Sequence, residues 1–98
     1  MTVELSPAAI ADANQAFNWY EDQRDGLGLE FSAELRRMVG MLAEYPELGH
    51  VVFGETRQAV LQRFPYSLFY RLLPGAVLVV AVFHASRDPK IWQIRPDA

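Results

Sequence analysis

An uninterrupted apolar stretch, Ala76 to Phe83, constrains the fold of this 98-residue chain more than any other feature. Eight residues are too few for a membrane helix, which needs about 20 apolar residues. They match the length of a strand, and a strand with apolar side chains on both faces must be covered on both sides. We therefore expect residues 76–83 to form an inner strand of a sheet.

Two helical patterns come before this strand. In each, apolar residues recur three and four positions apart, which places them on one helix face. Ser6 and Pro7 fit the N-cap and first turn of the first helix. Residues 25–28 fit a turn, and Pro46 ends the second helix. The apolar positions are Ile10, Ala13, Phe17 and Tyr20, then Phe31, Leu35, Met38, Leu42 and Tyr45. We expect an αα-hairpin that packs on the sheet.

The remaining segments complete an α+β fold. Residues 2–5 are a candidate N-terminal strand, and residues 57–63 and 67–73 have the composition of further strands. Residues 46–56, with two glycines, are predicted as a connecting loop, and residues 84–98 as a bend followed by an extended segment. The sequence thus predicts one domain over residues 1–98, in which the αα-hairpin packs on a small, mostly antiparallel sheet.

Composition and motifs exclude several kinds of chemistry. Cysteine is absent and the two histidines are far apart, so we expect no metal site, no cofactor and no thiol catalysis. No phosphate-binding loop, dinucleotide fingerprint or G-x-S-x-G elbow occurs. The N-terminus has neither a basic region nor an apolar core typical of a signal peptide, and we expect a cytoplasmic protein without a membrane partner.

Charge divides the chain into two unequal halves. Residues 1–56 carry ten acidic and three basic side chains, whereas residues 57–98 carry two acidic and six basic ones. Arginine side chains suit phosphate and carboxylate recognition, and a histidine can transfer protons near neutral pH. The residues of interest in the basic half are Arg63, Arg71, His84, Arg87 and Trp92. Each of them also has a purely structural interpretation, as an ion pair, a hydrogen-bonding residue or part of the core.

Local motifs and their order resemble the RelE/ParE superfamily of toxins from bacterial type II toxin–antitoxin modules. The resemblance covers about 90 residues of the chain. Its motifs are Ser6-Pro-x-Ala9, Trp19-Tyr20-Glu21, Gly26-Leu-Gly-Leu-Glu-Phe31, Phe64-Pro-Tyr-Ser-Leu-Phe-Tyr-Arg71 and Val82-Phe-His-Ala-Ser-Arg-Asp-Pro89, followed by Trp92.

This resemblance implies a cognate antitoxin that wraps and neutralises the toxin. The antitoxin would also carry the DNA-binding part of the pair, so contact with DNA would be indirect. Trp19 and Leu27 are apolar and lie off the main core positions of the two helices. Because an exposed apolar patch commonly marks a partner site, we expect these two residues to contact the antitoxin.

The superfamily combines two activities. RelE-like members cleave messenger RNA on the ribosome, and ParE-like members inhibit DNA gyrase. A nuclease site here would use Arg63, Arg71, His84 and Arg87. However, the chain has one lysine and no tyrosine after Tyr70, and its isoelectric point is about 5.2. We therefore favour gyrase inhibition without catalysis, with Arg63, Arg71, Arg87 and Trp92 contacting the target. The nuclease and a non-toxic, antitoxin-binding relative stay open as alternatives.

Overall fold

The computed structural model describes residues 1–98, which form five strands and three helices. In chain order these are β1 (Thr2–Leu5), α1 (Pro7–Gln23), α2 (Leu27–Glu44), β2 (His50–Phe53), β3 (Thr56–Val60), β4 (Tyr66–Leu73), β5 (Ala76–His84) and α3 (Lys90–Gln93).

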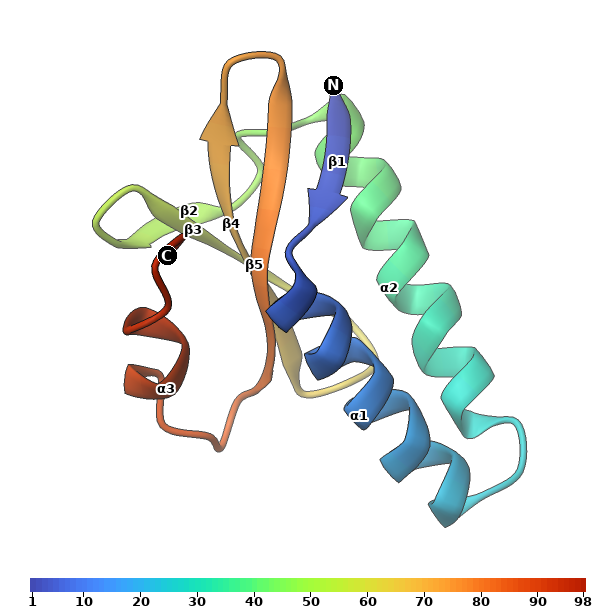
Figure 1. Cartoon of the computed structure of the whole chain (residues 1–98). Coiled ribbons are helices and arrows are strands. Elements are labelled where there is room, and N and C mark those ends of the chain that lie inside the picture. Colours follow the sequence, from blue (N-terminus) through green and yellow to red (C-terminus); the bar gives the residue numbers. More distant parts are fainter.

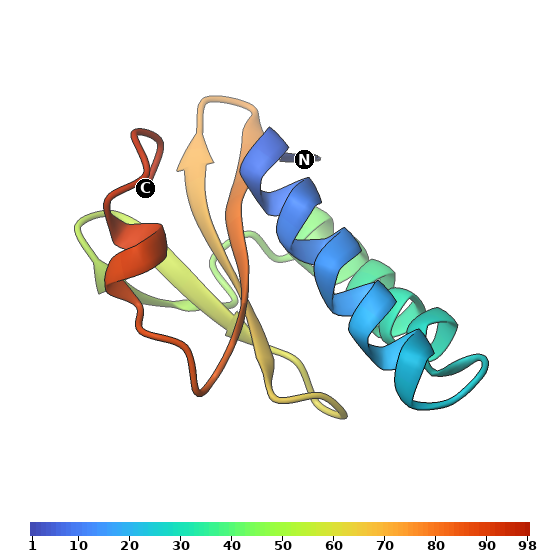
Figure 2. The same cartoon turned by 60° about the horizontal axis from the view of Figure 1, so that its bottom comes forward.

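A single five-stranded sheet lies at the centre of the molecule (Figure 1). The strand order is β1-β5-β4-β3-β2; β1 runs parallel to β5, and the other neighbours are antiparallel. Helices α1 and α2 lie side by side against one face, and the short α3 lies on the opposite side (Figure 2). The predicted α+β fold, with a helical hairpin on a mostly antiparallel sheet, is confirmed.

The apolar stretch forms β5 and is covered on both faces, as its composition predicts. On the helix side, Val77, Val79 and Val82 belong to the main core with Leu68 and Tyr70. On the other side, Val80, Ala81 and Phe83 of β5 form a second, smaller cluster with Phe69 of β4 and Trp92 of α3. The sheet therefore separates two apolar layers, and β5 contributes to both.

The first helix begins as predicted, but its predicted apolar face is only partly buried: Tyr20 belongs to the main core and Ala13 packs against it. The side chain of Ser6 accepts a hydrogen bond from the Ala9 N–H (3.1 Å), and Pro7 follows in the first turn. Ile10, however, is 49% exposed, while Ala9 and Ala16 are buried. The reason is that α1 packs on two neighbours. One line of residues faces the sheet, and the line predicted from spacing faces α2.

Two segments have more regular structure than predicted. Residues 46–56 are not only a loop, because they contain β2, which pairs with β3. The strand is only four residues long and is flanked by Gly49 and Gly54, so its sequence resembles that of a loop. Residues 84–98 are not extended, because they contain α3. Its Trp92 stacks on Phe69, with ring centroids 4.2 Å apart. This contact joins residues far apart in the chain and cannot be predicted from their neighbours.

Candidate functional site

The strand β5 is longer than its neighbour β1, and this difference creates an open edge. β1 pairs with β5 only as far as Leu5, opposite Val79. The chain then turns away at Ser6, whose N–H still donates to the Val79 carbonyl (2.9 Å), and enters α1. From Val80 to His84, β5 therefore has no strand on this side.

A buried ion pair occupies the first part of that edge. Asp12 of α1 accepts the Val82 N–H at Oδ2 (3.0 Å), and Arg95 donates from Nη1 to the Val80 carbonyl (2.9 Å). The two side chains also bind each other through two hydrogen bonds, of 2.7 and 3.0 Å. Because Arg95 donates these hydrogen bonds to the Asp12 carboxylate, its pKa is raised. The pair thus takes the place of two missing strand contacts and fixes the C-terminal segment to α1.

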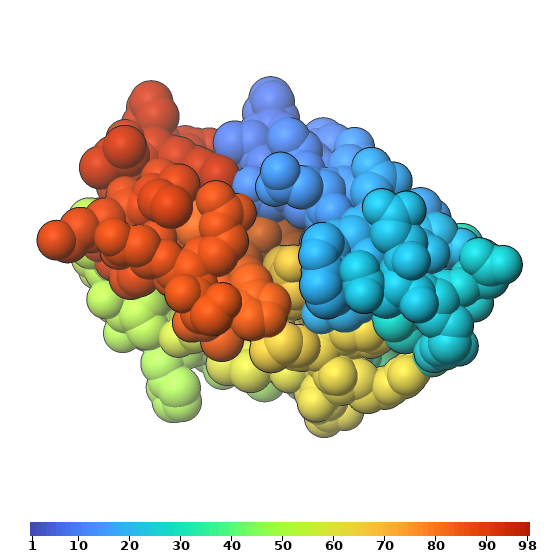
Figure 3. All heavy atoms as spheres, turned by 90° about the horizontal axis from the view of Figure 1, so that it is seen from below, coloured from blue at the N-terminus to red at the C-terminus, as the bar shows by residue number.

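Beyond this ion pair, two adjoining hollows lie between α1 and the end of β5. Their volumes are about 320 and 400 Å³, and both are lined by Trp19, Tyr66 and Arg87. Gln15 and Val82 line the first, and His84 lines the second. We call them together the α1–β5 groove. Figure 3 shows this face, hollowed between the orange segment after β5 and the blue α1.

A separate cleft lies on the other face of the sheet, under α3. It has a volume of about 320 Å³, and we call it the α3 cleft. Phe69, Phe83 and Trp92 supply its apolar lining, and Gln58 and Ser67 are hydrogen-bonded to each other within it (2.9 Å). His84 and Arg87 border this cleft as well as the α1–β5 groove. The end of β5 therefore contributes to both the α3 cleft and the α1–β5 groove.

Two of the predicted basic residues come together at the end of β5. The Arg87 guanidinium lies 4.1 Å from the centre of the Phe83 ring, and no carboxylate pairs with it. The Nδ1 atom of His84 accepts the Ser86 N–H (2.9 Å), and its ring packs edge-on against Tyr66 (5.2 Å). Burial raises the pKa of Tyr66. The local chemistry is a cation beside aromatic surface, which suits anion and peptide recognition.

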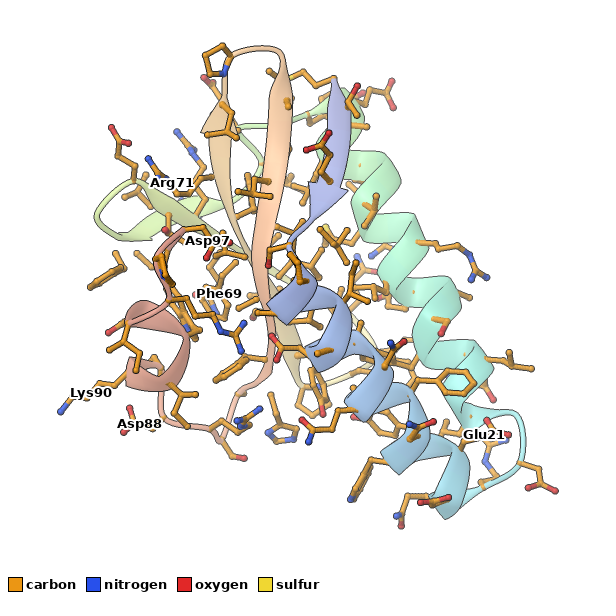
Figure 4. All side chains as sticks on the ribbon, in the orientation of Figure 1. Glu21, Phe69, Arg71, Asp88, Lys90 and Asp97 are labelled. Carbon is orange, nitrogen blue, oxygen red and sulfur yellow. The ribbon has the colours of Figure 1, made fainter.

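The other two predicted arginines lie elsewhere and are paired. Arg63, after β3, forms an ion pair with Glu30 of α2 (2.7 Å). Arg71, on β4, pairs with Glu55 of the β2–β3 turn (2.8 Å). Figure 4 shows Arg71 near that turn, away from Asp88 and Lys90, which lie beside α3. The expected cluster of Arg63, Arg71 and Arg87 does not form, because Arg71 lies opposite Leu78 near the start of β5, whereas Arg87 follows the end of that strand, and Arg63 is bound to α2.

The apolar residues predicted to contact a partner differ in their exposure. Trp92 is only 1% exposed, so it supports α3 and is not an exposed contact residue. Leu27 is half-buried and packs against the main core. Trp19 is 57% exposed and lines the α1–β5 groove. The sequence interpretation missed the role of Tyr66, although the motif that begins at Phe64 contains it, because its place opposite His84 depends on strand register.

The described chain offers no group of three or more His, Cys, Asp or Glu side chains that could hold a metal ion. None of its helices combines the length and apolar content needed to cross a membrane.

Comparison with solved structures finds a chain with the same architecture. The fold matches a chain of the chromosomal ParDE toxin–antitoxin system from P. aeruginosa with a TM-score of 0.77 and 17% sequence identity. The match covers 86% of this chain and 95% of the other, and at this identity it shows the shared fold. No curated protein matches the sequence significantly.

The sequence itself identifies the family. The profile of the ParE toxin of type II toxin–antitoxin systems, parDE, matches residues 3–89. The chain therefore belongs to the ParE toxin family of type II toxin–antitoxin systems. The superfamily resemblance of the sequence motifs is confirmed at the level of this family.

Proposed function

We propose that this ParE-family chain stops growth by binding and inhibiting DNA gyrase, and that a cognate antitoxin neutralises it. The observation that supports binding over cleavage is the separation of the basic residues. Arg63 and Arg71 each pair with a carboxylate at a different place, so only His84 and Arg87 of the nuclease candidates lie together. A phosphodiester transition state needs several positioned cationic and proton-transfer groups.

The remaining pair lacks an orienting partner from another part of the fold, because both polar contacts of the His84 ring come from the neighbouring Ser86. The Nδ1 atom of His84 already accepts the Ser86 N–H, and the Ser86 hydroxyl lies 2.8 Å from the same nitrogen. The rings of Tyr66 and His84 pack edge-to-face, and no hydrogen bond joins them. We therefore assign this region to recognition.

The target surface that we propose is centred on Arg87, which is exposed and has no carboxylate partner. Arg63 and Arg71 lie outside this centre, each paired with a glutamate, and add to the positive charge of the basic half only at a distance. Trp92 contributes indirectly by holding α3 against Phe69.

The antitoxin surface that we propose includes Trp19, whose exposed indole is apolar. The matched P. aeruginosa structure is that of a ParDE toxin–antitoxin system, so a relative of this fold has such a partner. Co-expression with the protein encoded beside this chain should then raise its solubility. Unchanged solubility and no co-purification would argue against an antitoxin.

A supercoiling assay with purified gyrase tests the proposed activity. The intact chain should inhibit supercoiling, and Arg87→Ala should inhibit at least about tenfold less while remaining folded. Induction of the chain alone should cause filamentation and a DNA-damage response. Rapid loss of translation with cleaved messenger RNA would instead support the nuclease, and normal growth would support a non-toxic relative.

A further inference from the structure

The open edge of β5 retains two backbone groups without a strand partner. Along a strand, each residue directs its N–H and C=O to one edge, and the next residue directs them to the other. The Val82 N–H donates to Asp12, so Val82 faces the open edge, and His84, two residues on, does so too. The Val82 carbonyl and the His84 N–H therefore point away from β4.

These two groups border the α1–β5 groove, because Val82 lines its first hollow and His84 its second. The spacing of a carbonyl and an N–H on alternate residues is what one residue of an added parallel strand would pair with, so such a strand would run in the same direction as β1. The edge nearer β1 is closed to such a strand, because Asp12 and Arg95 already occupy it. Any added strand must therefore be short and confined to the end of β5.

Charge favours an acidic occupant. Arg87 lines both hollows and has no carboxylate partner in this chain, and the one acidic side chain in the groove, Asp12, is bound to Arg95. An arginine beside an aromatic ring and next to exposed backbone groups is well placed to bind a carboxylate.

The walls of the groove favour a peptide with an apolar residue beside the acid. The exposed Trp19 ring lies on one side, and Tyr66 lies on the other. Trp19 packs edge-on against the buried Tyr20, with centroids 5.1 Å apart, which limits its mobility. A preordered aromatic surface gains affinity because little side-chain entropy is lost on binding.

We propose that the α1–β5 groove binds an extended segment of the antitoxin by strand addition to Val82 and His84, with an Asp or Glu of that segment bound to Arg87. The inference rests on the proposed existence of a neutralising antitoxin. It adds to that proposal the place, the backbone pairing and the charge of the bound segment.

Affinity measurements test the proposed contact between Arg87 and an acidic residue of the antitoxin segment. The co-expressed antitoxin, purified and titrated onto the full chain, should bind Arg87→Glu at least about 30-fold more weakly, because a carboxylate then meets a carboxylate. Lys90→Glu is the matched control: it makes the same change in charge three residues away, and Lys90 points into solvent (Figure 4). It should bind within about threefold of the unaltered chain. Trp19→Ser should weaken binding without changing charge.

Amide hydrogen exchange tests the backbone pairing. In the complex, the His84 amide should exchange at least about tenfold more slowly than in the free chain. The Val82 amide, already bound to Asp12, serves as the internal reference. If the antitoxin binds tightly but Arg87→Glu and the His84 amide are unaffected, the groove assignment is wrong and the proposed function stands. If no antitoxin binds the unaltered chain, the proposed function and this inference both fail.

Discussion

At the residue scale, the Asp12–Arg95 pair joins three parts of the fold: α1, β5 and the C-terminal segment. Asp12 is 8% exposed, and every polar contact it makes joins α1 to β5 or to the C-terminal segment. Removing one partner of a buried ion pair leaves an uncompensated charge, which costs more than the pair contributes as a unit.

Arg95→Ala should therefore lower the free energy of unfolding by about 3 kcal/mol, a large part of the stability of a domain this size. Urea denaturation measures the change. Arg36→Ala, at an exposed position of α2, should cost less than about 0.5 kcal/mol. The double variant Asp12→Ala/Arg95→Ala should lose less than the sum of its single changes. A loss below about 1 kcal/mol for Arg95→Ala would contradict this account.

Glu34 gives the stability of the chain a dependence on pH. Its buried carboxylate binds the Arg37 side chain and accepts the Gln62 N–H (2.9 Å), and the Arg37 hydrogen bond holds its pKa below the ordinary value of 4.5. Since the folded pKa is the lower one, the ionised carboxylate stabilises the fold above about pH 4.5. That contribution is lost as the pH falls through the folded pKa.

Urea midpoints measured between pH 6 and pH 3 should therefore fall, and they should fall less steeply for Glu34→Gln, which is already destabilised at pH 6. Glu47→Gln, at an exposed position without an ion pair, should keep the pH dependence of the unaltered chain. Equal slopes for Glu34→Gln and the unaltered chain would exclude Glu34 as the source.

At the element scale, the helical hairpin depends on close contact where α2 begins. Glu21 of α1 accepts the N–H groups of Gly26 (2.9 Å) and Gly28 (2.8 Å), and so binds donors that the start of a helix leaves free. A Cβ atom at Gly28 would lie 2.7 Å from the Phe17 carbonyl oxygen, which is too close. The crossing of the two helices therefore requires glycine at this position.

Two glycines of α2 make a matched pair of substitutions. Gly28→Ala should destabilise the chain by about 1–3 kcal/mol, because the two helix backbones must move apart. Gly40→Ala has open space around its Cβ and should stabilise the chain by about 0.5–1 kcal/mol, because alanine restricts the unfolded chain and favours helix. The thermal unfolding midpoints of the two variants, each compared with that of the unaltered chain, measure these changes. Changes of the same sign would show that helix propensity alone, not the contact, determines the outcome.

At the scale of the whole molecule, the end of β5 is where the two proposed binding functions meet. Arg87 borders the α3 cleft on one face and the α1–β5 groove on the other, and both the cleft and the groove open near it. An antitoxin segment in the groove would therefore cover the residue on which we centre target binding. This arrangement predicts neutralisation by direct exclusion.

Toxin and antitoxin mixed before gyrase is added should leave supercoiling uninhibited, and immobilised gyrase should retain no antitoxin. Free toxin should be retained, which serves as the positive control. A complex of gyrase, toxin and antitoxin recovered together would show that the two partners use separate surfaces, and neutralisation would then need another explanation.

Much of the fold could be predicted from local sequence. The Ser6-Pro7 helix start, the helix-ending Pro46 and the inner position of residues 76–83 depend on backbone chemistry and on unbroken apolarity, which neighbours in the chain reveal. The same information placed His84 and Arg87 near each other, since only two residues separate them.

Tertiary structure decided the rest. Which face of α1 is buried, the burial of Trp92 on Phe69, and the pairing of Arg63 and Arg71 with distant acids all depend on residues far apart in sequence. The open edge of β5 exists only because β1 is shorter than β5 in the assembled sheet. Sequence determined which residues could form helices and strands, because propensity and periodicity are local. The groove arose from the packing of those elements, because it depends on how their ends meet in space.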